Sequence, residues 1–303
     1  MRVLTDADVD RVPMARLVAA VREQIIADAQ GEAVAPPRHV VPFREGSLVF
    51  TIGGDRRLAG FRAYQTFGRP GHATDTQVVA AWDQVKTEMI GMAIGNRLGA
   101  LRTGAIGGVA ADILAPADAR TLAVIGTGRQ AETQLLGLST VRDFAEIRVC
   151  GRRADKADAF AQGISATIEK PVSAFTDARA AVEGADVVVL ATTSRAPVIE
   201  SDWVLPGAYV ATLGPSSVGA HELPLELADR ARVIVTDSPQ QLQSMGDDHM
   251  LAGLAPYRRI KHLGEIVADE RRADGAPALF LSIGLAGTEV ACLAACLEYL
   301  ASA

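Results

Sequence analysis

The segment that most constrains the fold is Gly126-Thr127-Gly128-Arg129-Gln130-Ala131, which lies between a β-rich run, TLAVI, and a helical pattern over 129–141. Its first glycine allows a tight turn, and its second lets the backbone approach a pyrophosphate. The sixth position must be small so that the helix packs closely on the strand, and Ala131 meets this need. The N-terminus of the helix then offers free N–H groups and a positive dipole end to phosphates. We therefore expect these six residues to bind a dinucleotide, the alternative being a purely structural glycine turn.

Strands and helices continue to alternate after this turn. The β-rich runs EIRVC, DVVVL, YVAT and RVIVT are separated by segments with helical patterns. This alternation predicts βαβ units, a parallel sheet and a Rossmann domain over residues 116–284. Ligands of such sheets bind at the carboxyl ends of the strands. The residues that follow two of these strands are therefore expected to border the cofactor: Thr192, Thr193, Leu213 and Gly214.

The end of the second strand bears on which dinucleotide binds. An NAD-binding domain usually has Asp or Glu there, for the ribose 2′-hydroxyl. This chain has Cys150-Gly151-Arg152-Arg153 instead, and two guanidinium groups suit a 2′-phosphate. We therefore expect NADPH as the preferred cofactor, with NADH as the alternative, unless Arg152 and Arg153 only form a basic surface turn.

The first 115 residues have a different pattern. Apolar positions predict one helix over 5–30, and short alternating runs from 38 to 82 predict an antiparallel sheet. The segment 88–113 predicts a helix in its second half, and an amphipathic helix over 285–303 is expected to pack back onto this part. The predicted fold is α/β, with an N-terminal α/β domain over 1–115 and a Rossmann dinucleotide-binding domain over 116–284.

Charge and composition argue against several classes of function. The net charge is −6 and charges of both signs are dispersed, which disfavours a nucleic-acid partner. We expect no membrane partner and a cytoplasmic location, because the chain has neither the apolar run of a signal peptide nor about 18 consecutive apolar residues. The five histidines show no metal-ligand spacing, so no metal site is expected.

Several segments resemble the ornithine cyclodeaminase/mu-crystallin family, and the resemblance covers nearly the whole chain. The segments are PPRHVVPF, LAGFRAYQTF, ALRTGA, LAVIGTGRQAETQL, GADVVVLATTSRAPVI, GAYVATLGPSSVGAHEL and SIGLA. Members include ornithine cyclodeaminases, ketimine reductases, pyrroline-2-carboxylate reductases and some alanine dehydrogenases. The resemblance implies hydride transfer between a nicotinamide and the α-carbon of an amino or imino acid. It also implies that the N-terminal domain binds the substrate and forms a homodimer through its sheet.

The resemblance further implies a clamp for the substrate α-carboxylate made by Arg38, Arg62 and Arg102. Arg62 replaces a residue that is usually lysine in the family. Arginine binds carboxylates bidentately, and orienting the substrate is most of what a hydride-transfer enzyme must do. Each arginine taken alone would more often form a surface ion pair. Thr74 is expected near the same carboxylate.

Two positions depart from the ornithine cyclodeaminases. Ser216 stands where they have Asp, and Val49 where they have Glu; the two missing carboxylates serve the amino groups of a diamine. Reducing a cyclic ketimine does not need such a base, and Ser216 can hydrogen-bond the ring nitrogen, unless it only supports the turn at Pro215. We therefore expect an NAD(P)H-dependent reductase of small cyclic ketimino acids such as pyrroline- or piperideine-2-carboxylate. The alternatives are an amino-acid dehydrogenase, an ornithine cyclodeaminase, or a protein that binds NADPH or a small ligand without catalysis.

Two glutamates near these segments have less definite roles. Glu222 is expected to cap the helix that follows it. Thr288-Glu289 stands where the family usually has an acidic pair, and the sequence assigns it no role.

Overall fold

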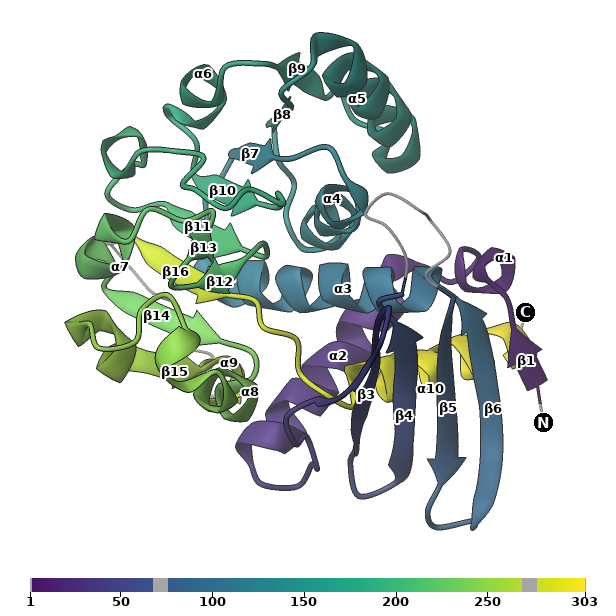
Figure 1. The fold of residues 1–303 in the computed structure, drawn as a ribbon. Coiled ribbons are helices and arrows are strands. Elements are labelled where there is room, and N and C mark those ends of the chain that lie inside the picture. Colours follow the sequence, from purple (N-terminus) through teal and green to yellow (C-terminus); the bar gives the residue numbers. More distant parts are fainter. Residues whose placement is uncertain (1, 68–75, 269–276, 303) are drawn as a thin grey trace.

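Two large sheets organise the protein, whose computed structural model describes residues 2–67, 76–268 and 277–302 (Figure 1). The first sheet comprises β1 (Arg2–Leu4), β2 (His39–Phe43), β3 (Gly46–Gly54), β4 (Leu58–Gln65), β5 (Gln77–Asp83) and β6 (Glu88–Gly95). Its strand order is β1–β6–β5–β4–β3–β2. Neighbours pair antiparallel except for β1 and β6, which run parallel. The antiparallel sheet predicted from residues 38–82 is therefore present, and it extends through β6.

The two faces of this sheet have different surroundings. Alternation along β3 places Val49 and Thr51 in the interior, whereas Ile52 is 54% exposed. Helix α10 (Thr288–Ser302) lies against the inner face and packs on β3 to β6, and α2 (Met14–Ala29) packs on α10 (Figure 1). The C-terminal helix thus covers a sheet built from the first part of the chain.

The second sheet contains eight strands, and all its neighbours are parallel. Its strands are β7 (Thr121–Ile125), β8 (Glu146–Cys150), β9 (Ser173–Phe175), β10 (Val187–Leu190), β11 (Tyr209–Thr212), β14 (Val233–Thr236), β15 (Ile260–His262) and β16 (Ala278–Leu281). They are ordered β15–β14–β16–β11–β10–β7–β8–β9. The helices of this part are α4 (Arg129–Val141), α5 (Ala154–Ile168), α6 (Ala178–Val182), α7 (Glu226–Arg230), α8 (Pro239–Ser244) and α9 (Leu263–Ala268). The predicted α/β fold with a Rossmann-type sheet is confirmed.

The helix predicted over 5–30 is wrong in one respect, because the segment forms two helices. Helix α1 (Asp6–Val9) begins with a capping box in which the Thr5 N–H donates to Asp8 Oδ2 at 2.9 Å. Pro13 then adopts an extended conformation with ψ near 135°, and α2 starts after it. The proline cannot continue the helix of α1 but suits the start of a new one.

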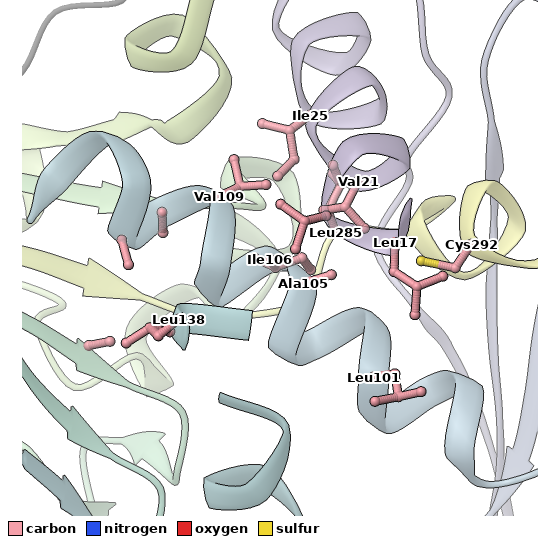
Figure 2. Close-up of a cluster of buried hydrophobic side chains, with 14 of the residues drawn as sticks. Leu17, Val21, Ile25, Leu101, Ala105, Ile106, Val109, Leu138, Leu285 and Cys292 are labelled. Atoms are coloured by element: carbon pink, nitrogen blue, oxygen red, sulfur yellow. The ribbon is translucent and has the colours of Figure 1, made fainter. Parts of the chain in front are cut away.

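Helix α3 (Arg97–Leu114) connects the two sheets and lies at the centre of the core. Figure 2 shows Leu285 among apolar side chains of α2 and α3, and Leu138 of α4 and Cys292 of α10 belong to the same cluster. Fifteen of the eighteen α3 residues are buried, so this helix has partners on nearly every side. Side chains on both sheets therefore belong to one continuous apolar cluster, which fixes how the two sheets are oriented.

Candidate active site

A cavity of about 470 Å³ opens at the carboxyl ends of β7, β8 and β10. This is the edge at which open parallel sheets bind ligands. Six of the residues that the sequence assigns to the cofactor line it: Gly126, Thr127, Gly128, Arg152, Thr192 and Thr193. The sequence and the fold therefore point to the same end of the sheet.

The turn after β7 leaves room for a pyrophosphate. Gly126 has φ near +128°, and a Cβ there would lie 2.3 Å from the Ala191 carbonyl oxygen, so only glycine fits. Gly128 is the N-cap of α4, and a Cβ there would meet nothing within 4 Å. Open space thus faces the unsatisfied N–H groups of α4, an arrangement suited to a phosphate. The residues present fit an NAD(P) dinucleotide.

The remaining residues assigned to the cofactor lie close by but are not part of the described cavity wall. Arg129, Gln130 and Ala131 form the first turn of α4, and Ala131 is fully buried. Leu213 and Gly214 follow β11. We interpret these residues as shaping the turn and the strand ends that border the cavity.

The two arginines after β8 have different environments. Arg152 lines the cavity. Arg153 instead pairs with Asp155 through two contacts, Nε to Oδ1 at 3.0 Å and Nη2 to Oδ2 at 2.5 Å. Both side chains of that pair are 64% exposed. The structure therefore puts only Arg152 in a position to face a bound ribose.

Glu222 is fully buried and connects the ends of two strands. The backbone N–H and the hydroxyl of Thr192 both donate to its Oε2 at 2.7 Å. Its Oε1 accepts from the Thr212 hydroxyl at 3.0 Å and from the N–H groups of Leu213 and Gly214 at 3.1 and 2.6 Å. One carboxylate thus holds the chain after β10 and after β11 in a fixed relation.

These contacts contradict the expectation that Glu222 caps a helix. Helix α7 begins four residues later, and its N-cap, Leu225, makes no side-chain hydrogen bond. The contacts of Glu222 are made instead with residues up to 30 positions away. The strand ends, rather than the helix, satisfy this buried carboxylate.

A second buried carboxylate, Glu289, lies between Arg62 and Arg102. Its Oε1 is 3.0 Å from Arg62 Nη1 and 2.9 Å from Arg102 Nε, and the Glu289 side chain is 2% exposed. Burial by itself would raise the pKa of Glu289, but Arg102 and Arg62 outweigh it and hold that pKa below its ordinary value. Glu289 is therefore an anion that draws two of the three predicted clamp residues together.

Arg62 has further partners on the inner face of its sheet. Its Nε donates to Gln77 Oε1 at 2.9 Å. Its guanidinium carbon lies 4.3 Å from the ring centroid of Tyr64, a cation–π contact. Arg102 is less well satisfied: among the described residues its buried Nη1 has no hydrogen-bond partner. Two cations sharing one carboxylate leave a site that can accept a second anion.

Arg38 directly precedes β2, and its hydrogen-bond partners, Gln241 and Ile283, come from the part of the chain that forms the parallel sheet. Its N–H and Nε donate to Gln241 Oε1 at 2.8 and 3.2 Å, and its Nη2 donates to the Ile283 carbonyl at 2.6 Å. Asp237 accepts the N–H groups of Ile283 and Gly284 at 2.8 and 2.9 Å. A Cβ on Gly284 would lie 3.0 Å from Arg102 Nη1. Arg38 and Arg102 therefore flank the same segment, 283–284.

Ser216 lies in a two-stranded hairpin formed by β12 (Ser216–Ser217) and β13 (Ala220–His221). Its carbonyl accepts the Met250 N–H at 2.8 Å. Val49 is buried and pairs with Tyr64 across β3 and β4, so an apolar side chain fills the position of the family's glutamate. Thr74 lies outside the described residues.

Sequence reasoning missed Glu222 and Glu289 as organising residues, and it did not single out Gln77 or Asp237. Glu289 left one signal, because it is an acidic residue in an otherwise apolar helix and so needs a partner when buried. Glu222, Gln77 and Asp237 left none, because their partners are distant in the sequence. Such contacts become visible only when the strands are assembled.

Two features of the described residues bear on metal and membrane binding. Over the described residues, His, Cys, Asp and Glu side chains form no group of three or more that could hold a metal ion. Within the same ranges, no helix combines the length and apolar character needed to cross a membrane.

Comparison with known proteins identifies the family. The model of the ornithine cyclodeaminase/mu-crystallin family matches residues 2–302. A Delta(1)-pyrroline-2-carboxylate reductase of Bacillus cereus is 33% identical over 227 residues, which are 73% of this chain and 70% of that protein. A putative dehydrogenase of Rhizobium meliloti is 36% identical over 171 residues, 55% of this chain but only 52% of that protein.

Solved structures share the fold over the whole chain. The Thermococcus litoralis Delta(1)-pyrroline-2-carboxylate reductase, in complex with NADH and L-proline, matches with a TM-score of 0.87 at 23% identity, covering 100% of this chain and 98% of that one. An archaeal alanine dehydrogenase dimer with bound NAD matches with a TM-score of 0.87 at 26% identity, covering 99% and 96%. By its sequence and its fold, the chain belongs to the ornithine cyclodeaminase/mu-crystallin family.

Proposed function

We propose that the protein is an NAD(P)H-dependent reductase of small cyclic ketimino acids such as pyrroline- or piperideine-2-carboxylate. The observation that carries this proposal is the buried group of Arg62, Glu289 and Arg102. Two cations share one carboxylate there, and Arg102 Nη1 has no hydrogen-bond partner in the described part of the chain. A substrate carboxylate would supply the missing anion. Two of the relatives are named as reductases of Delta(1)-pyrroline-2-carboxylate, a substrate of this class.

In this proposal each part of the chain has one task. A bound dihydronicotinamide supplies the hydride to the imine carbon. Arg38, Arg62 and Arg102 orient the imino acid through its carboxylate, while Glu222 fixes the strand ends that border the cavity. The division into a substrate domain over 1–115 and a cofactor domain over 116–284 belongs to the same proposal.

The missing carboxylates argue for reduction over cyclodeamination. Ser216 and Val49 hold no charge where an ornithine cyclodeaminase holds Asp and Glu, so the ammonium groups of a diamine would lack counterions. An amino-acid dehydrogenase is the second candidate, favoured by the 26% identity with the archaeal alanine dehydrogenase. A small substrate of that kind needs the same carboxylate clamp.

We also propose that the protein is a homodimer joined through the outer face of the first sheet. That face carries Phe50, Ile52, Phe61 and Trp82, and its apolar cavity of about 330 Å³ is lined by Phe50, Ile52, Gly60 and Phe61. Exposed apolar patches on a sheet commonly mark protein–protein contacts. The alanine dehydrogenase relative is described as a dimer, which supports this assembly.

The test is a panel of cyclic ketimino acids, pyruvate with ammonia, and L-ornithine, each with both nicotinamide cofactors, followed by the absorbance of the reduced cofactor. Turnover of a cyclic ketimine above the other substrates is expected. Arg102→Ala should lower kcat/KM for the ketimine, with a loss of transition-state stabilisation of about 2–4 kcal/mol, because one partner of a buried anion is lost. Nucleotide binding should be kept. Proline release from ornithine at a comparable rate, or nucleotide binding with no turnover, would contradict the proposal.

A further inference from the structure

The hairpin that contains Ser216 brings a histidine beside it. In the antiparallel pair of β12 and β13, Ser216 lies opposite His221 and Ser217 lies opposite Ala220. Directly opposed residues project their side chains to the same face, with Cβ atoms about 4.5–5.5 Å apart. The side chains of Ser216 and His221 are therefore neighbours, whereas Ser217 and Ala220 face the other side.

The hydrogen bond at His221 fixes which of its ring nitrogens is available. Nδ1 lies 2.8 Å from the Leu223 carbonyl oxygen. A carbonyl only accepts hydrogen bonds, so Nδ1 must carry hydrogen, and the neutral ring has its lone pair at Nε2. Among the described residues, neither Nε2 nor the Ser216 hydroxyl has a hydrogen-bond partner. Both side chains are half-buried, so this pair is accessible from one side.

The hairpin is held firmly next to the strand ends that border the cofactor cavity. The Val218 N–H donates to the Asp248 carbonyl at 2.8 Å, and the Ser216 carbonyl accepts from Met250. On the other side of the turn, Glu222 follows His221 directly and binds the backbone of Gly214. The Ser216–His221 pair thus has a fixed position relative to the chain after β10 and β11.

We propose that His221 is a positioning residue that acts through Ser216 to deliver the proton of the reaction. The inference rests on the proposed function, since it names the proton source for the same site. Reduction of C=N forms a C–H bond from the hydride, and the π electrons move to nitrogen. The nitrogen takes the Ser216 hydroxyl proton while the protonated ring of His221 passes its Nε2 proton to the Ser216 oxygen. The ring is then neutral, with its lone pair at Nε2, and regains a proton from solvent. In amino-acid oxidation the same proton moves in the opposite direction.

The chemistry explains why a histidine is needed beside the serine. A hydroxyl alone holds its proton too tightly to donate it near neutral pH, whereas a protonated imidazole releases one readily. The Nδ1 hydrogen bond to Leu223 keeps the ring oriented with Nε2 available. Ser216 and His221 together therefore replace the aspartate that the cyclodeaminases have at position 216.

The decisive variant is His221→Asn, because the Asn amide nitrogen can still donate to the Leu223 carbonyl while the Nε2 position is lost. We expect kcat to fall by about 100-fold, within the range of general acid–base catalysis, with KM for the imino acid and nucleotide affinity changed by less than about twofold. Ser217→Ala, on the opposite face of the same strand, is the matched control and should keep the wild-type kcat. Adding Ser216→Asp to His221→Asn should restore at least about tenfold of the lost kcat.

The assay uses whichever substrate the wild type converts best, since a proton moves at nitrogen in both directions. The rate of the wild type with cyclic ketimines tests the proposed function, whereas the ratio of variant to wild type tests the role of His221. An unchanged kcat in His221→Asn would overturn the inference. The nitrogen chemical shifts of the His221 ring test it without turnover. They should show that the neutral ring carries its hydrogen at Nδ1, and a neutral ring protonated at Nε2 would overturn the inference as well.

Discussion

At the scale of single residues, Glu289 shows how a buried carboxylate can serve two cations. Its carboxylate contacts both Arg62 and Arg102, and its own helix supplies no counterion. Removing one partner from such a group leaves uncompensated charge in a region that water does not reach. The stability of the protein should therefore depend on Glu289 far more than on Glu298, the other acidic residue of α10.

Glu289→Gln is expected to lower the free energy of unfolding by about 3–5 kcal/mol, measured by chemical denaturation. Glu298→Gln, in the same helix, is the control; its pair with Arg57 is 64% and 55% exposed, so the expected cost is below about 0.5 kcal/mol. Because the pKa of folded Glu289 is lowered, its stabilisation is complete above the ordinary value of 4.5 and is lost as the pH falls through the lowered value. Equal costs for the two variants at neutral pH would disprove this role.

Two neighbouring arginines are expected to contribute differently to the preference for NADPH over NADH. Arg152→Ala should weaken NADPH binding about tenfold or more and leave NADH nearly unchanged, because a charge-assisted contact contributes about 1.5–3 kcal/mol. Arg153→Ala should have little effect, since Asp155 already holds that side chain. Dissociation constants for both nucleotides, measured by calorimetry, provide the check. A loss of NADPH affinity in Arg153→Ala alone would show that the Asp155 pair opens on binding.

The same two arginines show what the sequence could and could not predict about the site. The fingerprint at 126–131 and the residues after β10 could be placed because they depend on local order along the chain. The different roles of Arg152 and Arg153 could not, because they depend on which side of the turn each one faces. Glu222 and Glu289 act across 30 and 227 positions of sequence, so no local pattern identifies their partners.

At the scale of elements, the contact between α3 and α4 positions the N-terminus of α4, which faces the cofactor cavity. A Cβ on Gly137 would lie 2.0 Å from the Gly104 carbonyl oxygen, and one on Gly104 would lie 2.1 Å from the Thr133 carbonyl oxygen. The two helix backbones therefore touch, and no side chain fits between them. The bounds of α4 were predicted correctly from the sequence, but this contact depends on glycines of two helices that only tertiary packing brings together.

Gly137→Ala should push α4 away from α3, cost about 1–3 kcal/mol of stability and weaken nucleotide binding. Gly163→Ala in α5 is the matched control, because a Cβ there meets nothing within 4 Å. That substitution should stabilise the protein by about 0.5–1 kcal/mol, since alanine is the better helix former. Thermal unfolding and nucleotide titration of both variants provide the measurement. Similar behaviour of the two would mean that the crossing has room to adjust.

At the scale of the whole molecule, the proposed homodimer would form through the exposed face of the first sheet. Ile52→Glu should convert the proposed dimer into a monomer, because a symmetric interface would contain the new carboxylate twice. Leu254→Glu, at another exposed apolar position, should leave the dimer intact. Light scattering after gel filtration distinguishes the two states. A wild-type protein that is monomeric, or an Ile52→Glu variant that remains dimeric, would rule out this interface.

The position of α10 has a consequence for how the protein is made. The strands of the first sheet leave the ribosome early, but the helix that covers their inner face is translated only after the whole parallel sheet. Throughout most of synthesis the nascent chain therefore exposes the apolar side of an incomplete layer, a state prone to aggregation. Folding of the first sheet has to wait for Thr288–Ser302, so this chain should depend on chaperones that hold nascent polypeptides until α10 has been made.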